Sequence, residues 1–334
     1  MSRVVVTGGG GYVGRHIVRQ LLQRGDEVVV WGRRTYPRVE AWGARCEVVD
    51  LSQDNSQLAA MLEGVDVVFH VAALPPYWAP LEVFQATNVE GTRRVIAACQ
   101  AAGVSRLVYT SSPSATFDGS DAEGKTEAEC PYPSQFDTPY AQTKAEGERL
   151  VLAANSDALA TTSLRPHLVY GPEEPHMLPR VIGRNRRRRL AVIGEGTNRV
   201  GLTYVENAAA AHLQAADALS PGSRNAGRAY FVHDDEPVSL WTWIKGLLHQ
   251  LDEPALNRTV SLSTARRIGR VMEWLWTWLP LTGEPPMTRF VATQLATSHW
   301  YDLSAAREDF GWHAPYSGEE GLAATVRWFR EHPV

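Results

Sequence analysis

Short apolar, mostly β-branched runs alternate along the first half of the chain with segments of helical periodicity. The runs cover residues 4–6, 27–30, 47–49, 67–71, 107–109 and 162–164. The segment after the first run places Val13, Ile17 and Leu21 on one helical face and stops at Gly25. Continuous apolar strands separated by amphipathic helices are typical of parallel sheets covered on both faces. The pattern therefore predicts an α/β fold with a doubly wound parallel sheet.

The pattern becomes irregular beyond Pro172, and eight of the eleven tryptophans lie after residue 240. We predict a dinucleotide-binding domain over residues 1–172, to which a segment near residues 203–232 returns. Residues 173–334 are then mainly a smaller, aromatic-rich, C-terminal substrate-binding domain. Ligands of open α/β sheets bind at the carboxyl ends of the strands, so we expect the second domain to lie over those ends.

The composition of the chain argues against several classes of function. The 334 residues carry a net charge of −4, which gives no electrostatic basis for binding nucleic acid. Cys46, Cys99 and Cys130 are scattered without the spacing of metal ligands or of a disulfide framework, so no metal site is predicted. The first strand begins at Val4 and leaves no room for a secretion signal. We expect a cytoplasmic protein.

A glycine-rich turn separates the first strand from the first helix. Gly8, Gly11 and Gly14 have the spacing that permits a tight turn, close approach of the backbone to a pyrophosphate, and close packing of the helix. The partial positive charge at the helix N-terminus then faces the phosphates. Tyr12 and Val13 open this helix and are predicted to line the same site. The context is that of a Rossmann-like dinucleotide-binding fold.

The residues after the second and third strands bear on the choice of cofactor. Arg33 and Arg34 stand where an NAD-dependent enzyme usually carries an acid, and two guanidiniums can pair with a 2′-phosphate. NADP(H) is therefore favoured, with NAD(H) as the alternative if both arginines are merely solvated. Asp50, followed by Leu51, is placed to accept a hydrogen bond from the adenine amino group or to cap the next helix.

A second motif supplies groups for proton transfer. Thr138 and Pro139 have the order of an N-cap followed by a first-turn proline, which predicts a helix start. Tyr140 and Lys144 then lie one turn apart on the same face. A free phenol titrates near ~10, and a neighbouring ammonium together with an oxidised nicotinamide would lower that pKa. Tyr140 is therefore the predicted proton donor and acceptor.

Hydroxyl groups at the end of the fifth strand supply a third catalytic candidate. The run Tyr109–Ser114 contains several of them at the edge of the sheet where ligands bind. We select Ser112 to hold the substrate oxygen, with Ser111 and Ser114 as alternatives, since hydroxyls at strand ends also form turns.

Taken together, these motifs resemble the extended short-chain dehydrogenase/reductase superfamily, and within it the 3β-hydroxysteroid dehydrogenase-like branch. The resemblance covers residues 4–329. It includes the glycine turn and the segments His70–Ala73, Asn88–Thr92, Tyr109–Ser112, Tyr140–Lys144, Leu164–Pro166, Tyr170–Pro172 and Thr203–Asn207.

The resemblance implies roles for further residues. Ser112, Tyr140 and Lys144 would be catalytic, and Asn88 would support the lysine through its backbone or a water molecule. Pro166 would lie against the nicotinamide. The remaining residues expected at the cofactor are Ala72, Ala73, Thr110 and His167. A homodimer is also implied.

The C-terminal part of the sequence indicates the class of substrate. Gly283–Phe290, Thr297–Tyr301 and Ala306–Gly311 resemble bacterial reductases of 2-alkyl-3-oxoalkanoates in long-chain olefin biosynthesis, whereas Ser114–Gly119 is similar to sterol-4-carboxylate dehydrogenases. Both imply an oxidoreductase that interconverts a ketone and a secondary alcohol on a bulky apolar substrate, and Arg33 and Arg34 favour NADP(H) as its cofactor.

Two other functions remain alternatives. A nucleotide-sugar epimerase or dehydratase would share both motifs, but it would prefer NAD and a polar pocket. A non-catalytic redox sensor would bind the dinucleotide without needing Tyr140 and Lys144.

The apolar segment Val271–Leu281 is too short to span a bilayer. It is expected to be either a buried helix or a mobile flap over the substrate or against a membrane, so contact with a membrane or with another enzyme of the pathway belongs to the expectations.

Overall fold

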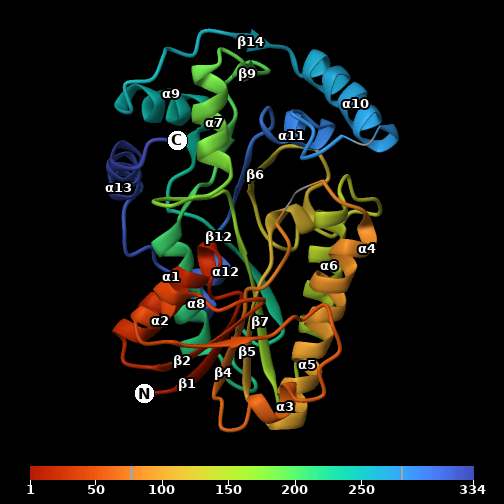
Figure 1. Ribbon diagram of the computed structural model, residues 1–334, viewed down its shortest axis with the longest axis vertical. Helices are drawn as coiled ribbons and strands as arrows, with labels where there is room; N and C mark the ends of the chain where they lie inside the picture. The colour runs from red at the N-terminus through yellow and green to blue at the C-terminus, as the bar shows by residue number, and fades with distance from the viewer. Residues whose placement is uncertain (76–77, 280) are drawn as a thin grey trace.

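The computed structural model describes residues 1–75, 78–279 and 281–334, and seven parallel strands form its large sheet (Figure 1). The strand order is β12-β7-β5-β4-β1-β2-β3. The strands are β1 (Arg3–Thr7), β2 (Glu27–Gly32), β3 (Arg45–Val48), β4 (Val67–His70), β5 (Arg106–Thr110), β7 (Ala160–Pro166) and β12 (Arg228–Val232). The six strands predicted from the sequence are all present, and β12 adds the seventh. The prediction of a doubly wound α/β fold is confirmed.

Helices cover both faces of the large sheet. One face carries α1 (Tyr12–Gln23), α2 (Pro37–Ala41), α8 (Val205–Ala218) and α12 (Ser304–Phe310); the other carries α3 (Leu58–Met61), α5 (Gly91–Ala102) and α6 (Pro139–Ala153). Val4 and Val6 pack with the first group of helices, whereas Val5 packs with the second. Because successive side chains of a strand point to opposite faces, an entirely apolar β1 fits a sheet that is buried on both sides.

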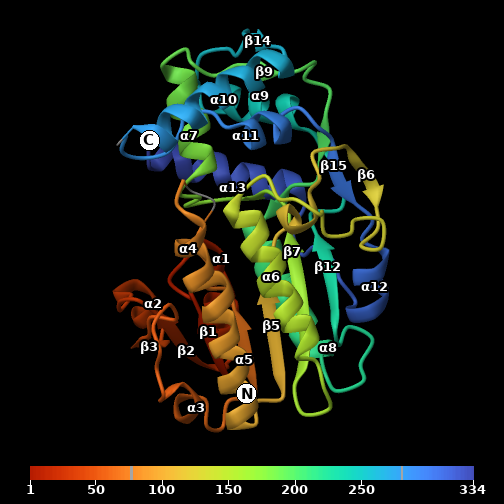
Figure 2. The same ribbon diagram turned by 90° about the vertical axis from the view of Figure 1, so that its right-hand side faces the viewer.

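The later part of the chain builds a second layer beyond the carboxyl ends of the large sheet. Figure 2 shows five helices gathered there: α7 (Met177–Arg186), α9 (Leu240–Gln250), α10 (Leu262–Trp278), α11 (Arg289–Gln294) and α13 (Gly318–Glu331). Their apolar side chains form a separate buried group that includes Ile182, Trp241 and Phe329. Ligands that bind at the strand ends would therefore lie between the large sheet and these helices.

The remaining strands are short and lie outside the large sheet. A four-stranded sheet contains β6 (Ala122–Lys125), β10 (Arg199–Val200), β13 (Val238–Ser239) and β15 (His299–Tyr301). Two further sheets have two strands each: β8 (Val169–Tyr170) pairs with β11 (Thr203–Tyr204), and β9 (Val192–Ile193) pairs with β14 (Thr259–Val260). The remaining short elements are α4 (Leu81–Phe84), the π-helical turn η1 (Gln85–Glu90) and the 3₁₀ turn η2 (Pro113–Thr116).

The helix boundaries follow the local signals in the sequence. The Thr138 hydroxyl accepts a hydrogen bond from the backbone N–H of Ala141 at 3.2 Å and caps α6, as predicted. Gly25 adopts φ +89° just after α1, a conformation that a residue with a side chain rarely adopts. Both caps set where the two helices of the candidate site begin or end.

The segment Val271–Leu281 is not a buried helix. Its residues up to 278 belong to α10, where Trp274 is 59% exposed and Trp278 is 71% exposed. Only Ala265 and Gly269 of α10 are buried; in its second half Val271, Trp274 and Trp278 are exposed, whereas Met272, Leu275 and Trp276 are half-buried. The buried-helix alternative is therefore wrong; Pro280 lies outside the described residues. Among the described residues, no helix combines the length and hydrophobicity needed to cross a membrane.

Candidate active site

The glycine turn lies where the strand order reverses, between β1 and β4. Gly8 has φ +69°, and a Cβ on it would fall 2.8 Å from the Ala72 Cα that follows β4. A Cβ on Gly14 would fall 2.3 Å from the Gly8 carbonyl oxygen. Only glycine fits at either position, and the N-terminus of α1 is thereby brought close to the ends of both strands. This cradle fits the pyrophosphate of a dinucleotide.

The other residues predicted around the turn form hydrogen bonds and packing contacts within the protein. The backbone N–H of Ala72 donates to the Thr7 hydroxyl at 3.1 Å, which fixes the start of the Ala72–Ala73 segment. Val13, in the first turn of α1, packs against the buried core on that face of the sheet, and the Tyr12 hydroxyl lies 2.9 Å from where a Gly171 Cβ would be. These residues surround the cradle from the α1 side and from the end of β4.

A tyrosine that the sequence did not single out covers the turn. A Cβ on Gly10 would fall 2.2 Å from the Tyr36 ring, and one on Gly32 would fall 2.5 Å from it. The guanidinium of Arg34 lies over this ring, 5.7 Å from its centroid. Arg33 and Arg34 are exposed and directly follow β2. Tyr36 therefore holds one of the two predicted arginines beside the glycine turn.

Asp50 does not cap the next helix, because α3 begins only at Leu58; it closes a local turn with Ser52 instead. Its Oδ1 accepts hydrogen bonds from the Ser52 backbone N–H at 2.9 Å and from the Ser52 hydroxyl at 2.7 Å. These hydrogen bonds lower the pKa of the Asp50 carboxyl. The next residue, Leu51, is buried and lies 3.2 Å from where a Gly91 Cβ would be. Asp50 thus stabilises its own turn and keeps an exposed carboxylate at the edge of the sheet.

Ser112 and Tyr140 meet at the carboxyl edge of the sheet. Ser112 caps η2, and its hydroxyl lies 2.8 Å from that of Ser114. Burial raises the pKa of Tyr140 above its ordinary value, and the Ser112 hydroxyl partly offsets this rise. The Ser111 hydroxyl is buried and forms no hydrogen bond within the described residues. Of the three serines considered, Ser112 is the one whose hydroxyl affects the pKa of the phenol, while its own hydrogen bond in the described structure is to Ser114.

Lys144 lies one turn beyond Tyr140 in α6, as predicted, but its ammonium contacts β5. Its Nζ donates to the Tyr109 hydroxyl at 2.8 Å and to the Thr110 carbonyl oxygen. The side chain is almost fully buried, and this burial lowers its pKa to about 7. The expected lowering of the Tyr140 pKa by a neighbouring ammonium is therefore absent from this structure, since the ammonium points to the strand.

Asn88 holds the helix that carries the lysine. Its side-chain oxygen accepts from the backbone N–H of Leu74 at 2.8 Å, and its amide donates to the Thr143 hydroxyl at 3.1 Å. Thr143 is the residue before Lys144, so Asn88 ties the segment after β4 to α6. The family resemblance implies that Asn88 supports Lys144. In this structure Asn88 contacts the preceding residue, Thr143, and not Lys144 itself.

A buried ion pair fixes the next turn of α6. The Arg165 guanidinium approaches the Glu148 carboxylate to 2.6 Å, and the hydroxyls of Tyr132 and Ser163 donate to the same carboxylate at 2.7 Å and 2.8 Å. Burial of Glu148 raises its pKa, but Arg165 and these hydrogen bonds leave it lowered overall. The negative charge also raises the pKa of Lys144 against the effect of burial.

The end of β7 and the end of β5 complete the site. Pro166 ends β7 and is buried. His167 is also buried, its Nδ1 is hydrogen-bonded to the Gly201 carbonyl oxygen, and burial holds its pKa well below the ordinary value. The Thr110 hydroxyl lies 2.7 Å from His212 Nε2. His167 is therefore neutral and shapes the wall of the site rather than supplying a charge.

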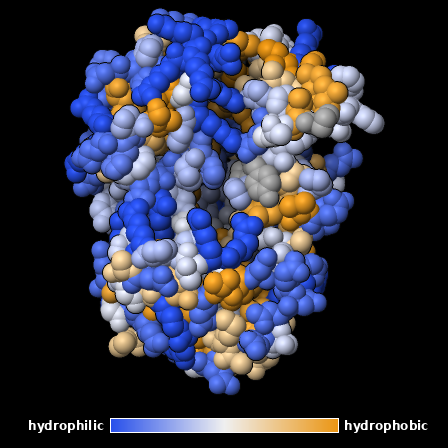
Figure 3. All heavy atoms as spheres, viewed as in Figure 1, coloured by the Kyte–Doolittle hydropathy of each residue, from blue (hydrophilic) through white to orange (hydrophobic). Residues whose placement is uncertain are grey.

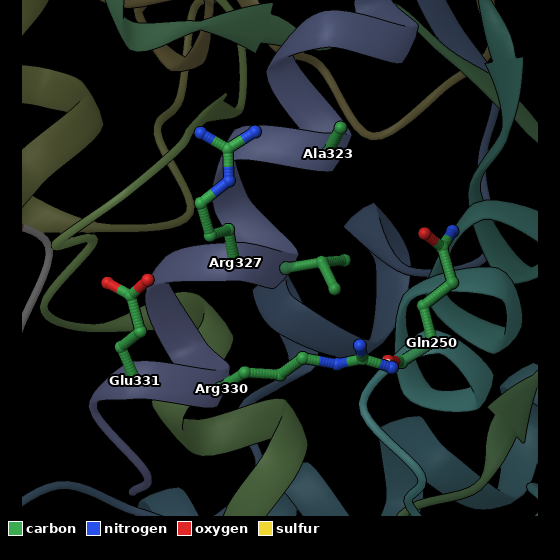
Figure 4. Close-up of a pocket in the computed structure, with 6 residues that line it drawn as sticks. Gln250, Ala323, Arg327, Arg330 and Glu331 are labelled. Carbon is green, nitrogen blue, oxygen red and sulfur yellow. The ribbon is translucent and has the colours of Figure 1, made fainter.

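A surface depression elsewhere is unsuited to the predicted substrate. Figure 4 shows it between α9 and α13, with a volume of about 380 Å³ and a lining that includes Gln250, Arg327, Arg330 and Glu331. Arg330 spans it and donates to the Gln250 carbonyl oxygen at 2.6 Å. None of the predicted site residues lines it, and its charged walls would not hold an apolar molecule.

The parallel sheet and the glycine cradle at its switch point define the class, an NAD(P)-dependent short-chain dehydrogenase/reductase. Residues 5–263 match the model of the 3-beta hydroxysteroid dehydrogenase/isomerase family. The chain belongs to this family and is an oxidoreductase.

Similar proteins extend over nearly the whole chain. It is 44% identical to the 2-alkyl-3-oxoalkanoate reductase of Stenotrophomonas maltophilia (strain K279a), over 96% of this chain and 97% of that one. It is 34% identical to the mouse (Mus musculus) sterol-4-alpha-carboxylate 3-dehydrogenase, decarboxylating, over 98% and 91%. A solved structure of MoeE5 in complex with UDP-glucose and NAD superposes with a TM-score of 0.74 at 27% identity, covering 99% of this chain and 100% of that one. The two resemblances predicted within the branch are confirmed.

Proposed function

We propose that the protein is an NADP(H)-dependent ketoreductase for a bulky apolar substrate of the 2-alkyl-3-oxoalkanoate type. Tyr140 protonates the substrate oxygen, Ser112 holds that oxygen, and Lys144 binds the ribose hydroxyls of the cofactor. The packing of α6 against η2 carries this proposal, because it brings Tyr140 and Ser112 together just beyond the end of β5, beside the glycine cradle.

The protonation states favour the reducing direction. The pKa of Tyr140 is raised by burial, so its phenol is protonated near neutral pH and has a proton to donate. The bound cofactor supplies the hydride for the carbonyl carbon. Ser112 donates its hydrogen bond to the oxygen on which negative charge develops. In this account Lys144 leaves Tyr109 and Thr110 to bind the ribose, and its proximity then lowers the pKa of the phenol.

The preference for NADP(H) depends on the end of β2. Arg33 and Arg34 are exposed there, where an acid would otherwise accept hydrogen bonds from the ribose of NAD. Tyr36 keeps Arg34 close to the glycine turn, within reach of a 2′-phosphate. Solved relatives are described with NAD, among them MoeE5, so the arginines are the feature that supports a different preference here.

Aromatic rings at the end of η2 that lies away from Ser112 support an apolar substrate. Phe117, just after η2, packs edge-on against Phe290 of α11 with the ring centroids 5.7 Å apart. His299 lies 6.2 Å from the same Phe117 ring. The relatives at 44% and 39% identity are both described as 2-alkyl-3-oxoalkanoate reductases. We therefore infer that the acyl chains lie against the face formed by η2 and α11.

Steady-state kinetics test the function. We expect the purified protein to oxidise NADPH in the presence of a 2-alkyl-3-oxoalkanoate, with a higher kcat/KM than with NADH. UDP-glucose serves as the comparison substrate, because a nucleotide-sugar epimerase or dehydratase would act on it without net consumption of NADPH. Turnover of the sugar nucleotide alone would contradict the proposal, and dinucleotide binding without any turnover would favour a redox sensor.

A further inference from the structure

The exposed apolar side chains of the protein concentrate on one segment. Of the thirteen large hydrophobic residues that are exposed among the described residues, seven lie between positions 268 and 291. Four of them form a stripe along α10: Ile268, Val271, Trp274 and Trp278. We call this set the α10 stripe. Figure 3 shows hydrophobic residues gathered on the surface over the end of this helix.

The opposite face of α10 is firmly attached to the protein. A Cβ on Gly269 would fall 2.7 Å from the backbone of Thr288 and Arg289, so α10 and the start of α11 are in close contact. Glu273 accepts hydrogen bonds from the Arg289 backbone N–H at 2.7 Å and from its guanidinium at 2.6 Å. The α10 stripe is thus presented outward by a helix whose other face is fixed.

Positive charge accompanies the stripe. Arg266, Arg267 and Arg270 are exposed on α10, and none of them forms an ion pair within the part of the chain that the structure describes. The one acid of the helix, Glu273, is paired with Arg289. The helix surface is therefore cationic, although the whole chain has a net charge of −4.

We propose that α10 docks the protein on an anionic membrane surface. The α10 stripe would enter the boundary between headgroups and acyl chains, where tryptophan is favoured, and the three arginines would pair with anionic headgroups. Trp78 and Val83 are also exposed, and Figure 1 places α4, which contains Val83, on the same side of the molecule as α10. The face that touches the membrane would then include the edge of the site where Tyr140 packs against Phe84.

A second copy of the chain fits this surface less well. A stable protein interface involves roughly 20–30 residues on each side, with few charged residues at its centre. The α10 stripe is one residue wide and is bordered by arginines that would face each other across a symmetric contact. A bilayer accepts a narrow, protruding apolar edge and supplies the opposite charge.

Vesicle co-sedimentation tests the proposal with the full-length protein. We expect binding to vesicles of phosphatidylcholine mixed with phosphatidylglycerol and much weaker binding to phosphatidylcholine alone. Trp274→Ser with Trp278→Ser should abolish the binding. Arg267→Glu with Arg270→Glu should weaken it by at least about tenfold, since each arginine near an anionic surface changes partitioning by about fivefold. The matched controls are Val48→Ser, at an exposed valine of β3, and Arg224→Glu, at an exposed arginine after α8; both should bind like the parent.

Three results would overturn the proposal. The first is equal binding to neutral and anionic vesicles. The second is binding that the tryptophan variant retains. The third is a solution dimer that binds no vesicles and dissociates in the tryptophan variant, because it would assign the α10 stripe to a second copy. Circular dichroism spectra of each variant are compared with those of the parent protein. Matching spectra show that a variant that no longer binds vesicles is still folded.

Discussion

At the scale of residues, burial shifts the pKa values of Tyr140 and Lys144 in opposite directions. It raises the pKa of the Tyr140 phenol and lowers the pKa of the Lys144 ammonium to about 7. Near neutral pH the phenol is protonated and the lysine is partly neutral. The side chain that binds Lys144 in this state is Tyr109, on β5, rather than Tyr140.

Removal of the phenol hydroxyl tests the role of Tyr140. Tyr140→Phe should reduce kcat by on the order of 100-fold or more, because general acid catalysis contributes that much, while the Kd for NADPH stays near that of the parent. Stopped-flow turnover and a fluorescence titration with NADPH measure the two quantities. Turnover close to that of the parent would refute the mechanism.

The lowered pKa of Lys144 predicts a pH-dependent effect on stability. Between pH 7 and the ordinary pKa of 10.5, the unfolded chain holds a proton that the folded chain has lost. The cost of burying Lys144 is therefore largest below pH 7 and falls as the pH rises through this window. The free energy of unfolding of the parent, relative to Lys144→Met, should increase by up to about 1.4 kcal/mol per pH unit there.

Urea unfolding at a series of pH values measures this difference. Lys245→Met, at an exposed position of α9, is the matched control and should show no such slope. If the difference in the free energy of unfolding between the parent and Lys144→Met does not change with pH, the lysine titrates normally in the folded protein.

The cofactor preference is tested at the end of β2. Arg33→Ala with Arg34→Ala should weaken NADPH binding by roughly 1.5–3 kcal/mol for each charged hydrogen bond lost, and NADH binding should hardly change. Titrations of parent and variant with both cofactors give the comparison. Equal losses for NADPH and NADH, or tighter NADH binding in the parent, would refute the assignment.

At the scale of elements, the turn between β1 and α1 depends on the absence of side chains. Gly14→Ala would place a Cβ 2.3 Å from a backbone oxygen, and backbone cannot move aside as a side chain can. We expect a loss of about 1–3 kcal/mol in the free energy of unfolding and a marked loss of NADPH binding. Gly246→Ala is the control, since a Cβ there meets no atom within 4 Å and α9 should gain up to about 1 kcal/mol. Unaltered dinucleotide binding in Gly14→Ala would show that the cradle is not the phosphate site.

The elements with strong local signals could be predicted, and those that depend on distant contacts could not. The six apolar strands and the Thr138 cap of α6 are encoded within a few residues, and the structure contains them. The strands of the four-stranded sheet have two to four residues each and no periodicity to identify them. They exist because β15 pairs with β6 across more than 170 residues of sequence.

The candidate site could likewise be predicted only where local sequence determines it. The positions of Tyr140 and Lys144 follow from helical spacing, whereas the contact of Lys144 with Tyr109 depends on how α6 lies against β5. The buried Glu148 and Arg165 pair also joins α6 to β7, and no local pattern indicates it. Tyr36 was missed because its place depends on the path of the loop after β2.

At the scale of the whole molecule, the large sheet and the helical layer beyond its strand ends enclose the proposed reaction between them (Figure 2). The sheet supplies the glycine cradle and the hydroxyl groups, while α11 supplies an aromatic wall through Phe290. The same layer carries α10 with its exposed stripe, so the proposed membrane contact and the proposed substrate face belong to one packed unit, joined where Gly269 meets α11.

Transfer of deuterium from NADPH that carries deuterium at both hydrogen positions of the nicotinamide C4 is the most direct test of the central claim. With a 2-alkyl-3-oxoalkanoate as substrate, the account predicts a secondary alcohol that carries one deuterium at the former carbonyl carbon, formed in step with NADPH oxidation. Tyr140→Phe should form this product at least about 100-fold more slowly. Absence of label at that carbon in the parent protein, or conversion of a sugar nucleotide without net oxidation of NADPH, would contradict the account.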